Sequence, residues 1–266
     1  MRMFTQPGRA TTQRCIVIGH RGAAAVCPEN TLPSLQTARD VGAEMIEFDV
    51  QQSADGELVV FHDETLERLC GDDRTIASLT AAELATMVVG QWHGQPVTIP
   101  SLDQVFSTLG HSVLYNAELK TDTIHYPGIE ARLASMVSAY SLTDHVLVSS
   151  FNHESLRLVR QCDPHLSLGL LLDRAQARQC DSPDGIVNRA RAFSCFSVHP
   201  EFRTVRQWPE LVTTCHIAGL RVFPWTVDDQ DDWQFLVEEV GVDGIITNDP
   251  GRLAGWLRAH SYSLPK

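Results

Sequence analysis

The chain has 266 residues and a formal net charge of −12 at neutral pH. Its hydrophobic fraction is 43%, and no apolar run approaches the roughly 20 residues of a membrane span, so the sequence predicts a globular protein without a transmembrane segment. The acidic balance argues against nucleic acid as the main partner, because each phosphate contact needs a local cation.

The seven cysteines are scattered and form no C-x-x-C pair. This pattern favours reduced thiols in the cytoplasm over a disulfide framework or a zinc site. Residues 1–14 lack the apolar stretch of a secretory signal, so we expect a flexible leader there and a single domain over residues 15–260. The composition is compatible with a monomer and with a homo-oligomer.

Short buried-looking apolar runs alternate with longer segments of helical periodicity along the chain. This alternation predicts repeated βα units, and eight strands are enough to close an α/β fold of the (β/α)8 TIM-barrel type. The predicted strands are 15–19, 45–50, 113–119, 146–151, 166–172, 193–198, 221–227 and 244–247. Among the helices, we predict 32–41 after Asn30-Thr31, 153–162 after Asn152, and 229–240 before Gly241.

The segment between the second and third predicted strands is too long for one helical crossover. We therefore expect a small inserted subdomain at about residues 51–110. A hairpin signal at Asp55-Gly56 precedes a short strand at 58–61. A capping box formed by Thr80 and Glu83 opens a predicted helix at 80–87, and another helix is predicted at 102–109.

Acidic residues lie at the carboxyl ends of two predicted strands, where barrels of this type carry their active sites. Glu47 and Asp49 are two residues apart and therefore face the same side, and Glu118 ends the next barrel strand. Buried like charges are costly unless cations compensate them. Three carboxylates without a nearby cysteine favour a hard divalent cation, Mg2+ or Ca2+, over Zn2+. The alternative is that Glu47 and Asp49 are solvated charges at a loop edge.

Two histidines, His20 and His62, also lie at strand ends, each beside a charged residue. Because imidazole titrates near neutral pH, one can accept a proton from an attacking oxygen while the other donates one to a departing oxygen. The Arg21 guanidinium can donate two parallel hydrogen bonds to the oxygens of an anionic phosphodiester, and the Lys120 ammonium adds a second positive charge. The alternatives are structural histidines and a surface ion pair of Arg21.

Several motifs follow one another in a characteristic order, from His20 over nearly the whole chain. They are His20-Arg21-Gly22, Pro28-Glu29-Asn30-Thr31, Glu47-Phe48-Asp49, Phe61-His62-Asp63, Ala117-Glu118-Leu119-Lys120, Ser150-Phe151-Asn152-His153-Glu154, Pro224-Trp225-Thr226-Val227 and Asp243-Gly244-Ile245-Ile246-Thr247. This series resembles the signature of the glycerophosphodiester phosphodiesterase family. The resemblance implies a barrel with an inserted subdomain that hydrolyses small glycerophosphodiesters to glycerol 3-phosphate and an alcohol.

The resemblance also implies a role for each candidate residue. One divalent cation would bind the three acidic residues, and the two histidines would act as general acid and base. Arg21 and Lys120 would hold the phosphate, and Trp225 would line the glycerol side. Two positions depart from the family pattern, Asp228 where asparagine is common and Asn248 where aspartate is common. We expect both at the rim of the mouth, with an effect on alcohol specificity.

Two other functions fit parts of the pattern. A related phosphodiesterase of lysophospholipids or sphingolipids would need an apolar groove near the mouth. A barrel that binds a phosphorylated ligand without turning it over would need neither an acid, a base nor a metal. For a hydrolase, two nucleophiles are compatible with the spacing: a water molecule, and the substrate's own glycerol hydroxyl through a cyclic phosphate.

Overall fold

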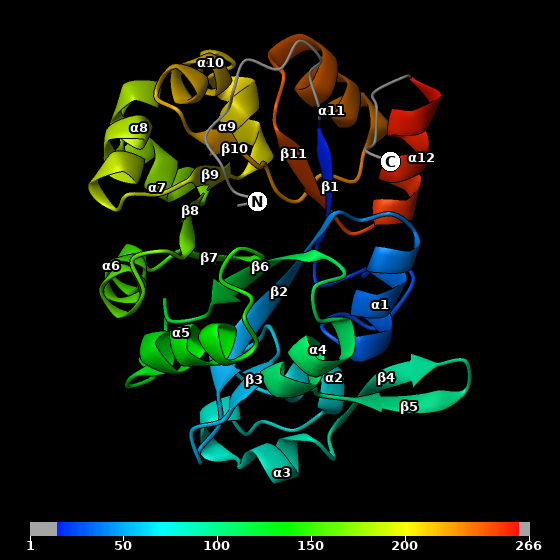
Figure 1. Cartoon of the computed structure of the whole chain (residues 1–266). Coiled ribbons are helices and arrows are strands. Elements are labelled where there is room, and N and C mark those ends of the chain that lie inside the picture. Colours follow the sequence, from blue (N-terminus) through cyan, green and yellow to red (C-terminus); the bar gives the residue numbers. More distant parts are fainter. Residues whose placement is uncertain (1–14, 261–266) are drawn as a thin grey trace.

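The computed structural model describes residues 15–260 as a barrel of parallel strands surrounded by helices (Figure 1). Within these residues, the barrel strands lie in the order β10-β9-β8-β7-β6-β2-β1-β11, and adjacent strands are parallel. The predicted (β/α)8 barrel is thus confirmed. Its strands are β1 (Ile16–Gly19), β2 (Met45–Gln52), β6 (Leu114–Leu119), β7 (Val146–Ser150), β8 (Ser167–Leu172), β9 (Ser197–Pro200), β10 (Arg221–Val222) and β11 (Gly244–Thr247).

Helices cover the outside of the barrel, and several begin with the caps expected from the sequence. The Asn152 side chain accepts from the Glu154 amide at the start of α6, and Thr31 caps α1. None of the helices within residues 15–260 has the length and hydrophobicity that crossing a bilayer requires. The helices are α1 (Leu32–Asp40), α4 (Leu102–Leu109), α5 (Ile129–Ala139), α6 (His153–Cys162), α7 (Arg174–Gln179), α8 (Pro183–Ala192), α9 (Phe202–Gln207), α10 (Glu210–Ile217), α11 (Gln230–Gln234), the π-helical segment η2 (Phe235–Val240) and α12 (Pro250–Ala259).

Side chains alternate between two cores along the barrel strands. β2 contributes Ile46, Phe48 and Val50 to the large core between strands and helices. Met45 instead joins a small apolar cluster with Ile246 of β11 inside the barrel. Because successive side chains of a strand point to opposite faces, the acidic residues of β2 point into the barrel interior, toward its carboxyl end.

The segment between β2 and α4 forms a smaller core of its own. β2 and β3 flank the turn at Asp55-Gly56 and pair antiparallel, as the hairpin signal predicts. The separate apolar cluster reaches from Val59 to Ile99, whereas α4, which the expected insertion included, packs in the main core. The elements of this segment are β3 (Leu58–Val60), α2 (Glu67–Cys70), η1 (Ile76–Ser78), α3 (Ala81–Leu84), β4 (Val88–Trp92) and β5 (Gln95–Thr98).

The structure differs from the predicted elements at several places. The helix predicted at 80–87 is limited to α3, which ends at Leu84. The sixth predicted strand begins later, because Phe193 ends α8 and Ser194 adopts a left-handed φ of 53°. The seventh predicted strand is regular only at β10, and beyond Pro224 it continues as an isolated bridge between Trp225 and Glu201. The last predicted helix becomes α11 followed by η2. The hairpin of β4 and β5, which turns at His93-Gly94, was not predicted. The expected leader lies outside the described residues.

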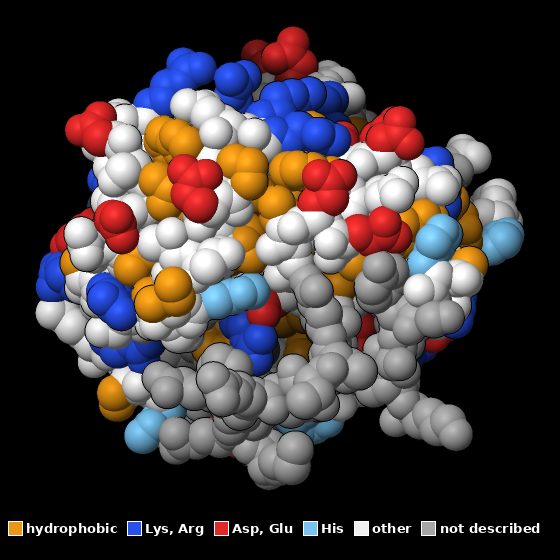
Figure 2. Space-filling view, turned by 90° about the horizontal axis from the view of Figure 1, so that it is seen from above, with side chains coloured by type: hydrophobic (Ala, Val, Ile, Leu, Met, Phe, Trp, Pro, Cys, Tyr) orange, Lys and Arg blue, Asp and Glu red, His pale blue; other side chains and the backbone are white. Residues whose placement is uncertain are grey.

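Large hydrophobic side chains are exposed singly on the described surface. Val26, Val41, Val88 and Ile217 are each at least 36% exposed and come from different elements. Figure 2 shows one face of the molecule, on which acidic, basic and hydrophobic side chains are interspersed and basic ones gather along one edge. Scattered apolar side chains of this kind are normal for a protein surface and do not indicate a binding patch.

The barrel closes between β10 and β11 through backbone hydrogen bonds at the amino and carboxyl sides of the seam. The Asp243 amide donates to the Val222 carbonyl at 3.1 Å, and the Ile246 amide donates to the Pro224 carbonyl at 3.0 Å. The Asp243 carboxylate adds a clamp, because it accepts from the Val222 amide at 2.8 Å and from His216 and Arg221. Asp243 precedes β11, so the clamp lies at the barrel end away from the strand-end carboxylates.

We predict that Asp243→Ala lowers the free energy of unfolding by about 3 kcal/mol, because it leaves a buried amide and an arginine without their acceptor. Urea unfolding followed by circular dichroism measures this loss. The matched control is Glu239→Ala, which removes an exposed carboxylate. Equal stability of the two variants would contradict the clamp.

Candidate active site

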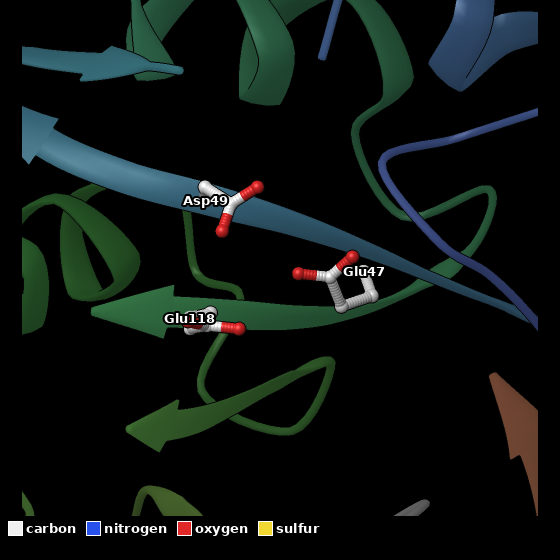
Figure 3. Close-up of side chains that lie close together, drawn as sticks. All are labelled: Glu47, Asp49 and Glu118. Carbon is white, nitrogen blue, oxygen red and sulfur yellow. The ribbon is translucent and has the colours of Figure 1, made fainter. Parts of the chain in front are cut away.

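Three carboxylates converge at the carboxyl ends of two neighbouring strands. Glu47 and Asp49 extend from β2 and Glu118 from β6, and Figure 3 shows their carboxylates directed into one space. Each of them offers an oxygen that lies within 4.8 Å of the other two. The register pairs Asp49 with Glu118, which brings together residues far apart in the sequence. All three residues are buried, so the reading as solvated loop-edge charges is wrong.

The electrostatics of this triad fit a divalent cation. Burial and the neighbouring carboxylates raise the pKa of Glu47, and burial raises the pKa of Glu118 to about 7. For Asp49, burial is outweighed by Lys120 and Arg21, which lower the pKa to about 2. The Glu47 Oε1 atom is buried without a hydrogen-bond partner. An oxygen-only donor set with repelling charges and an unpartnered oxygen could bind Mg2+ or Ca2+.

Two cations lie against the carboxylates. The Lys120 Nζ atom is 2.8 Å from Glu118 Oε1 and 3.7 Å from Asp49 Oδ1. The Arg21 Nε atom is 3.4 Å from Asp49 Oδ2, and its Nη1 atom is 2.9 Å from Glu29 Oε1. Both side chains are less than a fifth exposed, so the surface ion pair considered for Arg21 is wrong. Their charges offset part of the repulsion among the acids.

The turn after β1 aims Arg21 at the triad. Arg21 has a left-handed φ of 51°, and its amide donates to Glu47 Oε2 at 2.8 Å. Gly22 follows with a φ of 87°, and a Cβ atom there would lie 2.5 Å from Ser34 Oγ and 2.6 Å from the Ser34 carbonyl carbon. Only glycine fits at that point. Asn30, also left-handed, donates from Nδ2 to Asp49 Oδ2 at 2.8 Å.

His20 flanks the triad on the β1 side. Its Nε2 atom lies 4.0 Å from Glu47 Oε2, and its Nδ1 atom lies 2.7 Å from Asn248 Oδ1. Burial and the Arg21 charge lower the pKa of His20 to about 4. The resting ring is therefore neutral near pH 7, and one nitrogen can accept a proton.

His62 approaches from the inserted segment and is oriented by an ion-pair network. Its Nδ1 atom lies 2.6 Å from Asp63 Oδ1, and Arg68 Nε donates to the other Asp63 oxygen at 2.5 Å. Arg68 also donates to Glu29 Oε1 at 2.6 Å, and Glu29 accepts from Arg21. A continuous chain of charges thus joins the two halves of the site. The motif series also includes Leu66-Glu67-Arg68, but the sequence analysis assigned no role to Arg68.

One cavity of about 200 Å³ lies among these side chains; both histidines, Arg21 and Lys120 line it, and so do Glu47 and Glu118 of the triad. The Trp225 ring lies in its wall, edge to face with Phe151 at 5.4 Å, and its Nε1 donates to the His199 carbonyl. The sequence analysis missed Phe151 and Asn116, although both lie in strand-end segments that it singled out. Both amide atoms of Asn116 are buried without a partner. The cavity lining consists of His20, Arg21, Glu47, His62, Asn116, Glu118, Lys120, Phe151, Leu171, Trp225 and Ile246.

Comparisons with known proteins identify the family. The profile of the Glycerophosphoryl diester phosphodiesterase family matches residues 20–252. A glycerophosphodiester phosphodiesterase of Caldanaerobacter subterraneus is 38% identical over 92% of this chain and 98% of its own length.

Solved structures show the same fold. The glycerophosphodiester phosphodiesterase of Thermotoga maritima superposes with a TM-score of 0.76 at 26% identity, over 91% of this chain and 98% of its own. An Oleispira antarctica phosphodiesterase in complex with the product sn-glycerol 3-phosphate superposes with a TM-score of 0.74 at 28% identity, over 92% of this chain and 97% of its own. The chain belongs to the glycerophosphoryl diester phosphodiesterase family, and it is an enzyme of that class.

Proposed function

We propose that this enzyme cleaves glycerophosphodiesters to glycerol 3-phosphate and an alcohol by metal-assisted acid/base catalysis with two histidines. The observation that carries the proposal is the convergence of two imidazoles, two cations and the Glu47 and Glu118 carboxylates on one cavity, with Asp49 completing the acidic cluster. The Oleispira antarctica relative binds sn-glycerol 3-phosphate, which supports the same product here. The reaction breaks the bond between phosphorus and the oxygen of the leaving alcohol.

Glu47, Asp49 and Glu118 would hold one divalent cation, Mg2+ or Ca2+. When bound, such a cation neutralises charge on a phosphoryl oxygen during displacement. The protein's part is to keep the three acids at one point, through the register of β2 and β6. The cations Arg21 and Lys120 lie on either side of Asp49 and remain available for phosphate oxygens. Trp225 and Phe151 provide an apolar wall beside the glycerol.

His20 and His62 would exchange protons with the attacking and departing oxygens. Each ring has its Nδ1 atom engaged, by Asn248 and by Asp63 respectively, which leaves Nε2 for the substrate. One imidazole takes the proton of the nucleophile, a water or the glycerol hydroxyl, and the other protonates the leaving alcohol. The engaged Nδ1 atoms fix both rings, so little reorganisation is needed when substrate binds.

The two alternative functions are not favoured. The family match and the named relatives concern glycerophosphodiesters, and the exposed hydrophobic side chains of the described chain are scattered. A pure binding barrel has no use for an acid and a base beside a metal site. The cytoplasmic location and the single-domain organisation remain predictions.

We predict that Glu118→Gln, which keeps the shape and removes one charge, weakens divalent-cation binding about tenfold or more and lowers glycerol 3-phosphate release about 100-fold. Calorimetric titration with MgCl2 and with CaCl2 measures the first effect, and turnover of glycerophosphocholine measures the second. Glu57→Gln changes an exposed carboxylate and serves as the control. Unchanged cation affinity in Glu118→Gln would refute the metal assignment.

We predict that His20→Ala and His62→Ala each lower kcat about 100-fold or more, because each removes a proton-transfer group, while cation binding is retained. Steady-state turnover of glycerophosphocholine, with the same titrations alongside, separates the two effects. His165→Ala alters an exposed histidine and should leave kcat unchanged. Wild-type kcat in either site variant would exclude that histidine from catalysis.

A further inference from the structure

Asp228 lies directly behind His20, in the loop that follows β10. The Asp228 carbonyl accepts from Arg252 Nη1 at 3.2 Å, and the preceding Val227 carbonyl accepts from Trp233 Nε1 at 2.9 Å. The Val227 amide donates to the Ile246 carbonyl at 3.0 Å. These bonds fix the Asp228 backbone against the end of β11, although its side chain is exposed.

The Asp228 carboxylate accepts three hydrogen bonds from the end of β11. Its Oδ1 atom accepts from Thr247 Oγ1 and from the Asn248 amide, both at 2.8 Å. Its Oδ2 atom accepts from Asn248 Nδ2 at 2.6 Å. A carboxylate is only an acceptor, so the group of Asn248 that faces it must be the NH2 group. The Asp228 carboxylate therefore fixes which end of the Asn248 side-chain amide is NH2 and which is oxygen.

This orientation determines the tautomer of His20. With the Asn248 NH2 group turned to Asp228, its Oδ1 atom faces His20 Nδ1 at 2.7 Å. Because that oxygen can only accept, Nδ1 must carry the proton. The neutral ring then has an unprotonated Nε2 atom, which is the nitrogen on the side of Glu47 and the cavity.

We propose that Asp228 is a positioning residue that acts through Asn248 to hold His20 as the Nδ1–H tautomer, with Nε2 free for proton exchange. The kinetic consequence rests on the proposed function, whereas the tautomer does not. As a base, His20 needs the lone pair on Nε2. As an acid it carries protons on both nitrogens, and Asn248 Oδ1 again accepts the Nδ1–H bond.

An isosteric change should reverse the whole chain of bonds. In Asp228→Asn, the new side-chain oxygen accepts from the Thr247 hydroxyl and from the Asn248 backbone N–H. The new NH2 group at position 228 therefore faces the Asn248 side chain. Two NH2 groups cannot pair, and Asn248 therefore turns its oxygen to residue 228 and its NH2 group to His20. The ring must then accept at Nδ1 and carry its proton on Nε2.

Exchanging both residues should restore the original arrangement. In the double variant Asp228→Asn, Asn248→Asp, the carboxylate at 248 accepts from the NH2 group at 228 and from His20 Nδ1–H. All donors and acceptors are again matched. The double variant therefore tests the bonding pattern separately from any general damage to folding.

The experiment records 15N–1H spectra of the imidazole rings in the full chain under mildly alkaline conditions, with His20 assigned by its loss in His20→Gln. We expect Nδ1–H at His20 in the wild type and in the double variant, and Nε2–H in Asp228→Asn. We also expect kcat for glycerophosphocholine to fall about 100-fold in Asp228→Asn and to recover at least tenfold in the double variant. KM should change far less than kcat, since Arg21 and Lys120 are untouched.

The matched control is Asp229→Asn, whose side chain caps α11 and makes no bond to Asn248; it should keep the wild-type spectrum and kcat. The proposal is overturned if the wild-type ring is Nε2–H, if Asp228→Asn keeps Nδ1–H, or if the exchanged pair fails to restore it. A switched tautomer with unchanged kcat would support the positioning by Asp228 and refute the proposed catalytic role of His20.

Discussion

Three carboxylates buried within 4.8 Å of one another repel strongly, and the surroundings of Glu47, Asp49 and Glu118 are organised around that repulsion. Arg21 and Lys120 are drawn to Asp49, and Asn30 donates to it. The Glu47 Oε1 atom still lacks a hydrogen-bond partner. Such a cluster is expensive in a folded protein unless a cation occupies it. A binding site for a dication explains why the fold retains it.

The barrel makes this cluster possible at low conformational cost. Alternation along β2 places Glu47 and Asp49 on the inner face, and parallel pairing with β6 places Glu118 opposite. The loops at the same barrel end then add the two histidines, His20 from the turn after β1 and His62 from the inserted segment. Each histidine is oriented from behind by a residue that does not face the cavity.

The sequence predicts much of this because strand periodicity is local. The spacing of Glu47 and Asp49 alone places both on one face of a strand, and the structure shows that this face is buried. The pairing of Asn248 with His20 spans 228 residues, and no local pattern indicates it. Asparagine at position 248 departs from the family pattern, and we expected this departure to affect alcohol specificity. The structure instead places Asn248 behind a histidine. The hairpin at His93-Gly94 was missed because His93 adopts a left-handed φ of 48°, which side chains disfavour. The shortness of β10 follows from Pro224, which has no amide to donate, although Trp225 beyond it still pairs with Glu201.

The central claim is spatial: one dication sits among three acids, with two imidazoles reaching the same phosphorus. A crystal structure of the enzyme with Mn2+ as an anomalous substitute and sn-glycerol 3-phosphate tests it most directly. The account predicts an anomalous peak bonded to oxygens of Glu47, Asp49 and Glu118, with the phosphate between His20 and His62. A metal peak elsewhere in the cavity, or a phosphate out of reach of both histidines, would contradict it.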